Sequence, residues 1–349
     1  MSAISDVFRE QAPHCLALGS PFMHRLMELA ADHWPLDEAI ATRFTAFSGD
    51  IGPKGASLPL RFAGALHALV LTGRAPYLAE VYPPHAVSDA ALLAAIKRAL
   101  SEEEAFVLDW VDSPPQTNEV RRSATLLAVA SHLATQFPGL PFRLSELGAS
   151  AGLNLMFEQF ALETPSGVIG QLASPVRLTP EWSGDAPQIA PVRVTERRGV
   201  DLIPINPNSP EGALRLLAYL WPDQSDRLAR TRAAIDLAQA PVDEGDAAAW
   251  IAARTATPAP GQIHLIYHTI AWQYFPADTD AACATAIANA GARATPTAPV
   301  AHLSVEADGK APGAALRLTL WTGTPEPEIL NLGRMDAHGR HIVLAAPAR

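Results

Sequence analysis

The sequence predicts an α/β protein in which a helical N-terminal part precedes an open, mostly parallel β-sheet. Up to about residue 136, apolar residues such as Phe22 and Leu26 recur at intervals of three and four, the period of an amphipathic helix. After Pro141, short apolar runs alternate with helical stretches, as expected for parallel strands covered on both faces. A length of 349 residues fits two domains, which we place at residues 1–136 and 137–349.

Capping residues and prolines divide the N-terminal part into helices. Ser20 followed by Pro21 predicts the start of one helix, because a serine side chain caps the first turn and proline fits its first position. Ser88 predicts the start of a second helix, over residues 88–111. A third helix is expected over residues 120–135, after a pair of prolines.

The C-terminal part is expected to alternate strands and helices, with a loop and hairpin inserted at about residues 163–191. The expected strands are 143–147, 192–201, 263–268, 300–305, 316–321 and 341–345. The expected helices are 151–162, 211–239, 246–254 and 279–291. Pro222 predicts a break or kink in the second of these helices.

Charge and composition argue against several classes of partner. The net charge is −10, and no run of Lys or Arg is present that would neutralise a nucleic-acid backbone. The two cysteines have neither disulfide-framework nor zinc-site spacing. No export signal and no apolar stretch long enough for a membrane span is seen, so we expect a cytoplasmic protein with a small-molecule partner. The oligomeric state is left open.

The most informative segment is the turn that follows the strand at 143–147. Glu146 ends this strand, and Gly148, Ser150 and Gly152 belong to a run of small residues that leads into the next helix. Such a turn lets backbone N–H groups approach a ligand closely, and a helix N-terminus favours an anionic group. The turn therefore predicts a cofactor site, and the plain alternative is a tight strand-to-helix connection without a ligand.

The same letters allow a second interpretation, because residues 148–152 also spell G-x-S-x-G, the nucleophile elbow of α/β-hydrolases. Ser150 would then be a nucleophile. The order of elements disfavours this interpretation, since helices rather than strands precede the turn. A dinucleotide-binding fingerprint is also disfavoured, because it requires glycine where Ser150 and Leu153 stand.

Glu146-x-Gly148-x-Ser150-x-Gly152 resembles the first motif of class I S-adenosylmethionine-dependent methyltransferases, with serine replacing the middle glycine. Asp201 looks like the acid by which that family holds the ribose hydroxyls, with Glu196 as a rival, and Asp246 looks like the acid that accepts from the adenine amino group. The resemblance implies a Rossmann-like sheet and S-adenosylmethionine as cofactor. The residues it implies as contacts are Glu146, Gly148, Ala149, Ser150, Gly152, Asn154, Asp201, Asp246 and Ala247.

The chain as a whole is similar to the bacterial family called domain of unknown function 2332. The similarity lies in residues 114–119, 146–154 and 221–224, which are spread over most of the length. That family carries no activity to transfer, so the resemblance supports the domain boundaries and leaves the substrate open.

Candidate substrate contacts flank the turn on the sequence. Gln116, Asn118 and Glu119 precede the helix at 120–135, where they either cap that helix or contact cofactor and substrate. Tyr267 and Trp272 lie around the end of the fourth strand, either lining a pocket or filling the core.

His268 ends the fourth strand, and its ordinary pKa suits a general base, although a satisfied core histidine is the plain alternative. The spacing of His338 and His341, without a carboxylate partner, argues against a metal site. We therefore expect a methyltransferase for a small molecule held between the two domains. The alternatives are a serine esterase using Ser150 and a non-catalytic protein that retains the fold.

Overall fold

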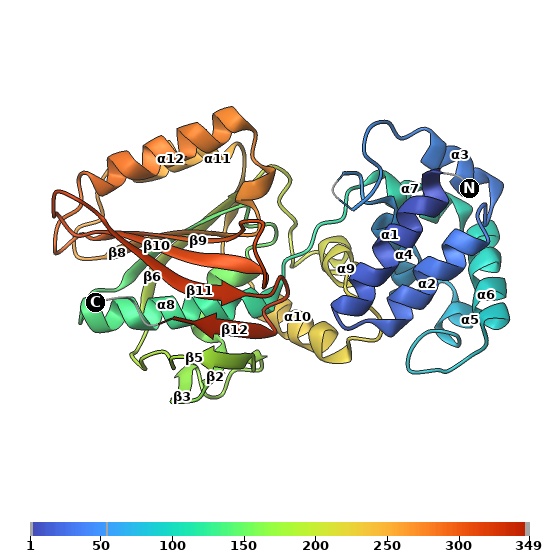
Figure 1. The fold of residues 1–349 in the computed structure, drawn as a ribbon, viewed down its shortest axis with the longest axis horizontal. Coiled ribbons are helices and arrows are strands. Elements are labelled where there is room, and N and C mark those ends of the chain that lie inside the picture. Colours follow the sequence, from blue (N-terminus) through green and yellow to red (C-terminus); the bar gives the residue numbers. More distant parts are fainter. Residues whose placement is uncertain (1–2, 54, 346–349) are drawn as a thin grey trace. The chain divides into compact units, whose positions relative to one another are not determined.

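The computed structural model of the chain describes residues 3–53 and 55–345 (Figure 1). The chain forms two compact units, and neither is continuous in sequence. One unit comprises Met1–Thr117 and Ser209–Arg232, and the other comprises Asn118–Asn208 and Ala233–Arg349. The sequence analysis placed one boundary at residue 136, between two continuous domains, whereas each of these units contains two separate segments. No helix of the described residues has the length and apolar character needed to cross a membrane.

The first unit is helical. Its helices are α1 (Ala3–Ala17), α2 (Pro21–Asp32), α3 (Glu38–Thr45), α4 (Leu58–Leu71), α5 (Pro76–Ala79), α6 (Asp89–Glu102), α7 (Glu104–Asp112), α9 (Pro210–Ala218) and the first part of α10 (Ser225–Leu237). The predicted start of α2 is confirmed, since the Ser20 hydroxyl accepts from the Met23 amide and Pro21 is the first helical residue. The single helix expected over 88–111 was wrong. It is divided at Glu103, which lets Leu100 and Val107 enter one core.

Helix α4 forms the centre of the helical unit and explains why a distant segment belongs to it. Nearly all of α4 is buried, as expected for a helix that is apolar on every side. A Cβ at Gly64 would lie 2.6 Å from the Tyr219 ring, so only glycine permits this approach. His67 Nδ1 lies 3.2 Å from the carbonyl oxygen of Ala218. These contacts attach residues 209–232 to the helical unit.

The second unit contains a nine-stranded mixed sheet. Its strands are β1 (Phe142–Leu147), β5 (Glu181–Gly184), β6 (Val194–Asp201), β7 (Val242–Glu244), β8 (Ile263–Thr269), β9 (Val300–Ala307), β10 (Ala314–Trp321), β11 (Glu328–Met335) and β12 (His341–Leu344). The order across the sheet is β5-β12-β11-β10-β9-β8-β1-β6-β7. The five strands from β7 to β9 are parallel to one another. The pairs β9-β10, β10-β11 and β11-β12 are antiparallel, and β5 is parallel to β12. The predicted α/β class with a mostly parallel sheet is confirmed.

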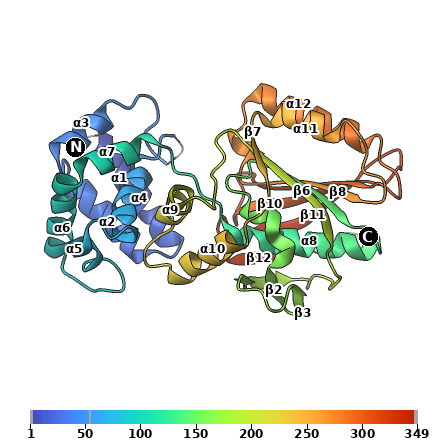
Figure 2. The same ribbon diagram turned by 180° about the vertical axis from the view of Figure 1, so that it is seen from behind.

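Helices cover both faces of this sheet. Figures 1 and 2 show α11 (Ala247–Thr255) and α12 (Ala277–Gly291) on one face and α8 (Ser123–Gln136) on the other. A small second sheet contains β2 (Ala161–Thr164), β3 (Gly167–Gly170) and β4 (Arg177–Leu178). Three short 3-10 helices are η1 (Val120–Arg122), η2 (Leu153–Gln159) and η3 (Trp272–Tyr274). A core cluster lies between α11, α12 and the sheet, with Leu147, Ile266 and Ile287 among its members.

Two expectations about individual elements need correction, and the break expected at Pro222 is confirmed. The helix expected over 151–162 is instead the 3-10 helix η2, and the amide of its first residue, Leu153, donates to the Asn118 side chain. The helix expected over 211–239 is interrupted at Trp221–Gln224, as Pro222 predicts, and becomes α9 and α10. Strands β7 and β11 were missed. Gly333 and Asn331 conceal the alternating pattern of β11, which pairs with the preceding strand β10.

Candidate functional site

The sheet has a topological switch point between β1 and β8. From β1 the chain continues to β6 and β7 on one side, and from β8 it continues to β9 on the other. These five strands are parallel, so their carboxyl ends meet at one edge, where open α/β sheets bind ligands. Glu146, Asp201 and His268 lie at the ends of β1, β6 and β8, and Asp246 follows β7 by two residues. The sequence motifs thus share one edge of the sheet.

The turn after β1 directs its backbone amides toward the protein. The amides of Gly148 and Ala149 both donate to the carbonyl oxygen of Val200, at 3.0 Å. The Ser150 amide donates to the Asp201 carboxylate at 2.8 Å. Positive φ angles at Gly148 (71°) and Ser150 (54°) curl the chain in this way. The expectation that these amides contact a ligand is therefore not met by Gly148, Ala149 or Ser150, because β6 already uses them.

The glycines of the turn are explained by close packing. A Cβ at Gly148 would lie 2.5 Å from the Cβ of Ala271, and one at Gly152 would lie 2.8 Å from a methyl group of Val242. Both glycines also have φ near 70°. The turn therefore needs glycine at these positions whether or not a ligand is bound.

Two hydrogen-bond donors in the turn remain unused. Ser150 is 5% exposed, and its hydroxyl has no hydrogen-bond partner among the residues that the structure describes. Within the same described part of the chain, the Ala151 amide also donates no hydrogen bond. Buried polar groups are nearly always paired in folded proteins, so two adjacent unpaired donors at a switch point suit an acceptor supplied by a ligand.

Asp201 holds the turn after β1 and is followed by two exposed apolar residues. Besides the Ser150 amide, its carboxylate accepts from the Ile203 amide at 3.0 Å. The next two residues, Leu202 and Ile203, are 68% and 66% exposed. Exposed apolar side chains of this size beside a strand end are unusual and offer an apolar surface at the switch-point edge.

Glu196, the rival acid, lies nearer the amino ends of the strands. It pairs with Arg143, at 3.1 Å, and with Arg254. Its register partner Arg143 belongs to the start of β1, whereas the switch-point edge is at the end of β1. Asp201 is therefore the acid of β6 that lies at the switch-point edge.

Asp246 is the N-cap of α11. One carboxylate oxygen accepts from the amides of Ala248 and Ala249, and the other accepts from the Thr279 hydroxyl at 3.2 Å. Asp246 is exposed, and Ala247, the first residue of the helix, is buried. The capping contacts account for an acid at this position, and the exposed carboxylate still lies at the same edge as Asp201.

A buried polar network lies beneath the turn. The Tyr267 hydroxyl lies 3.5 Å from a Glu146 carboxyl oxygen and 3.3 Å from the carbonyl oxygen of Asn154, and its single proton is shared between these two acceptors. The Ser123 hydroxyl donates to the Asn154 side-chain oxygen at 2.7 Å. Burial, followed by the charge of Asp201, raises the pKa of Glu146 well above its ordinary value. Acids perturbed in this way cluster at functional sites.

Asn118 and Glu119 belong to the same network. The Asn118 side chain accepts from the Leu153 amide at 2.9 Å, and the Asn154 side chain donates to the Glu119 carbonyl oxygen at 3.3 Å. The Glu119 carboxylate accepts from the Arg121 amide and caps η1. Both residues are buried, so their position favours support of the turn over direct substrate contact. Gln116 belongs to the helical unit.

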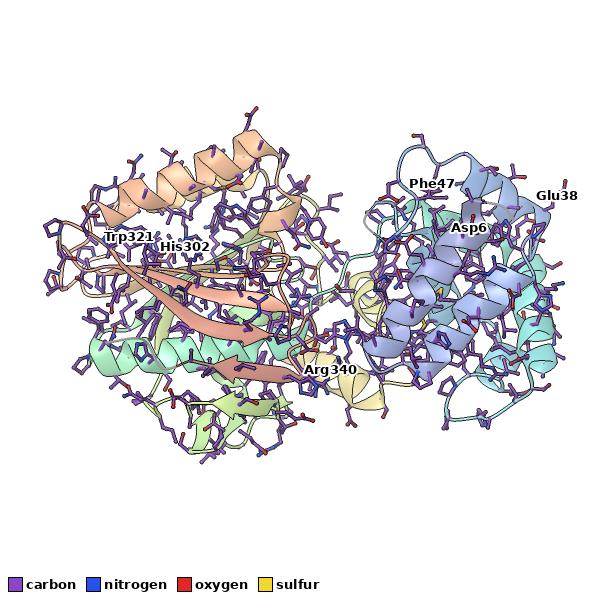
Figure 3. All side chains as sticks on the ribbon, in the orientation of Figure 1. Asp6, Glu38, Phe47, His302, Trp321 and Arg340 are labelled. Carbon is purple, nitrogen blue, oxygen red and sulfur yellow. The ribbon has the colours of Figure 1, made fainter. Side chains whose placement is uncertain are left out.

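His268 lies on the opposite face of β8 from Tyr267 and has partners at both ring nitrogens. Nδ1 lies 2.7 Å from a carboxylate oxygen of Glu306, and Nε2 lies 3.1 Å from Nε2 of His302. The Trp272 ring covers it, with ring centroids 4.5 Å apart. His302 is on β9, beneath α12 (Figure 3). The side chain is 2% exposed, so a substrate cannot reach it without displacing a neighbour.

Glu306 holds the loop after β8. The carboxylate oxygen that meets His268 also accepts from the amides of Ala271 and Trp272, at 3.0 and 3.1 Å. Burial by itself raises the pKa of Glu306, but the hydrogen bond and charge of His268 and the two amides together hold it below the ordinary glutamate value. Burial lowers the pKa of His302 to about 3, and the charge of His268 acts in the same direction. The cluster is therefore a charged carboxylate followed by two histidines.

Comparison with known proteins identifies a family for the chain. The model of the family described as "Uncharacterized protein conserved in bacteria (DUF2332)" matches residues 5–343. The chain belongs to this family. No curated protein and no solved structure matches it. The predicted family is confirmed, and the functional conclusion depends on the site itself.

The sequence did not reveal Glu306 and His302. In this family member they are brought to His268 by the pairing of β8 with β9. A local signal was present, because polar residues at 302, 304 and 306 alternate with Leu303 and Val305 along one strand. The hydrolase interpretation gains no partner, since no histidine of the described chain lies within hydrogen-bond distance of the Ser150 hydroxyl.

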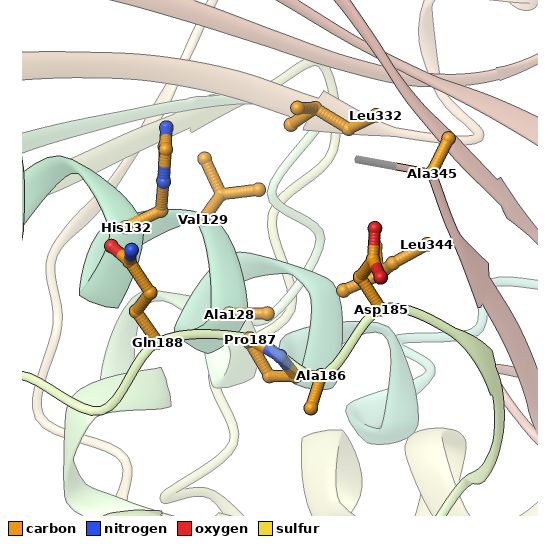
Figure 4. A pocket seen from close by; sticks show the side chains of 10 residues that line it. All are labelled: Ala128, Val129, His132, Asp185, Ala186, Pro187, Gln188, Leu332, Leu344 and Ala345. Carbon is orange, nitrogen blue, oxygen red and sulfur yellow. The ribbon is translucent and has the colours of Figure 1, made fainter. Parts of the chain in front are cut away.

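A separate apolar pocket of about 240 Å³ lies on the α8 side of the sheet (Figure 4). Its walls include Val129 and His132 of α8, Gln188 of the insertion, Leu332 of β11 and Leu344 of β12. None of the residues predicted as site residues lines it. Three regions far apart in sequence form this pocket, so no local pattern could indicate it. The described residues contain no cluster of His, Cys, Asp and Glu suited to a metal ion.

Proposed function

We propose that the protein is an S-adenosylmethionine-dependent methyltransferase that acts on a small molecule. The observation that carries the proposal is the strand order β7-β6-β1-β8-β9, with acids at or just past the ends of β1, β6 and β7. Because these strands are parallel and adjacent, the resembling motifs share one edge of the sheet, beside a switch point. The fold alone would not specify an activity, so the argument uses the site residues.

The residues at this edge fit an amino-acid-bearing nucleoside. A carboxylate accepts up to about four hydrogen bonds, so Asp201 can hold the turn and contact ribose hydroxyls together. Leu202 and Ile203 supply an apolar surface for a base, and the Ser150 hydroxyl and the Ala151 amide supply donors for a carboxylate. Asp246 is the acid assigned to the adenine amino group. When bound, the cofactor would supply an activated methyl group on a sulfonium centre.

Positioning and exclusion of water are the main tasks of the chain in this proposal. The packed glycines, Asn118 and the Asp201 contact fix the turn, so its donors are held in place before a ligand arrives. His268 was expected to be a base, and its two occupied nitrogens favour a positioning role. It contacts the Glu306 carboxylate that holds the loop after β8 and packs against Trp272 of that loop. A base is required only for an acceptor that must lose a proton.

Titration with S-adenosylmethionine and with its demethylated product tests the proposal. We expect calorimetry to show micromolar binding to the full-length chain. Bound ligand should also raise the melting temperature, because a ligand concentration about 100 times Kd raises the free energy of unfolding by about 2.7 kcal/mol. Leu202→Ser with Ile203→Ser should weaken binding about tenfold, because exposed side chains contribute apolar contact without supporting the fold. Leu172→Ser is the matched control, since Leu172 is 71% exposed and lies in the insertion.

Absence of binding of both compounds to the wild-type chain would reject the proposal. Equal weakening by Leu172→Ser would reject the assigned base surface. Labelling by a fluorophosphonate that is lost in Ser150→Ala would instead support the hydrolase. Binding without turnover over a broad set of acceptors would indicate a protein that has retained the fold and lost the activity.

A further inference from the structure

A groove of about 590 Å³ lies on the face formed by β9, β10 and β11, among residues to which the proposed methyl transfer gives no role except Glu306. Its lining includes Ser304 of β9, Arg317 of β10, Asn331 of β11 and Lys310 of the β9–β10 connection. The volume is within the range of small-molecule sites.

Strand register aligns the floor of the groove. Arg317 pairs with Ser304 on one side and with Asn331 on the other. Directly opposite residues on one face have side chains about 5 Å apart, so these three form a continuous polar row. Leu303 and Val305 alternate with Ser304 and are buried on the opposite face of β9.

The wall of the groove is rigid. Arg334 donates to both carboxylate oxygens of Asp308, at 3.0 and 2.7 Å. It also donates to the carbonyl oxygens of Lys310, Pro312 and Gly313, at 2.6 to 2.8 Å. The hydrogen bond and charge of Arg334 and the local amides keep the pKa of Asp308 well below its ordinary value. Arg334 thus fixes the hairpin that borders the groove and neutralises its acid.

Each of the two acids of the groove has an arginine or histidine partner. Two of its basic side chains, in contrast, have no acidic partner among the described residues. Asp308 pairs with Arg334, and Glu306 pairs with His268. Among the described residues, the side chains of Arg317 and Lys310 make no hydrogen bond or ion pair. The groove therefore presents two uncompensated positive charges on a chain whose net charge is −10.

We propose that this groove binds a small molecule through an oxyanion, either a carboxylate or a phosphate group. The Arg317 guanidinium offers a planar pair of donors that matches either group, and Lys310 adds a second positive charge. Ser304 and Asn331 flank Arg317 and supply hydrogen bonds to oxygens of the same ligand.

Calorimetric titration of the full-length chain with malonate and with inorganic phosphate, at constant ionic strength, tests the assignment. We expect at least one probe to bind with Kd below about 1 mM. Arg317→Gln should weaken that binding about tenfold or more, because it removes the charged donor pair. Asn331→Asp should do the same by placing a carboxylate beside Arg317. Arg193→Gln is the matched control, an exposed arginine of the same unit outside the groove.

Binding of malonate alone assigns a carboxylate ligand, and binding of phosphate alone assigns a phosphate ligand. The inference is overturned when neither probe binds, or when Arg317→Gln and Asn331→Asp bind as tightly as the wild-type chain. Melting temperatures of the variants, which alter exposed side chains, establish that each is folded. None of these outcomes depends on S-adenosylmethionine binding, so this inference and the proposed function can fail separately.

Discussion

Acidification should destabilise the sheet unit through His264, a buried residue of β8. Its Nε2 lies 2.8 Å from the Ser145 hydroxyl, to which Arg254 also donates. Burial, reinforced by the charges of Arg143 and Arg254, lowers the pKa of His264 from 6.5 to about 3. The unfolded chain therefore takes up a proton below pH 6.5 that the folded chain refuses. Stability is complete above that pH and is lost as the pH falls toward the folded pKa.

The size of this loss of stability follows from the difference between the pH and the pKa of His264 in the unfolded chain. At about pH 5 the difference is about 1.5 units, so His264 should cost about 2 kcal/mol of unfolding free energy relative to about pH 7.5. His264→Gln keeps a partner for Ser145 and has no proton to gain. The pH-dependent loss in the variant should therefore be about 2 kcal/mol smaller than in the wild-type chain.

Hydrogen exchange of peptides that cover β1 and β8 measures this loss within the sheet unit, after correction for intrinsic exchange at each pH. A two-unit protein needs such a local measurement, because a single global transition is not assured. The same pH-dependent loss in His264→Gln and in the wild-type chain would refute the reasoning.

Two further predictions concern the switch-point edge. Gly148→Ala should cost about 3 kcal/mol in unfolding free energy, because φ is positive there and the new Cβ would lie 2.5 Å from Ala271. Gly139 also has a positive φ but open surroundings, so Gly139→Ala should cost only the smaller backbone strain. Equal losses of stability in the two variants would contradict the packing argument. Glu306→Gln should cost about 2 kcal/mol and speed hydrogen exchange at the Trp272 amide, because the acceptor loses its charge and the new NH2 group replaces a buried oxygen that has no hydrogen-bond partner among the described residues. Unchanged exchange at this amide would contradict the role of Glu306.

Local chemistry accounts for the parts of the fold that the sequence predicted. Ser20 and Pro21 define the start of α2 because capping involves only the first turn. Strands β1 and β8 lie where they were expected, because apolar residues alternate along each of them, at 142 and 144 in β1 and at 263 and 265 in β8. Residues 209–232 join the helical unit through contacts with α4, and no short-range pattern encodes such a partner.

The sequence predicted the local features of the candidate site but not its contacts between distant residues. The sequence indicated that a turn of small residues follows the acid at 146. It also indicated that His268 lies at the end of a strand. Its pattern did not indicate that Glu306 and His302 occupy both nitrogens of that histidine, since they lie more than thirty positions away and meet it through strand pairing.

The sequence by itself determined the alternation of strands and helices, the position of the glycine turn and the family, because spacing and residue type act over a few neighbours. Only the tertiary structure decided that Val200 and Asp201 take the amides of the turn, that Glu146 is buried, and that Arg317 faces a groove without an acidic partner. Hydrogen bonding, burial and charge pairing at these positions depend on strands that are adjacent in the sheet and distant in the chain.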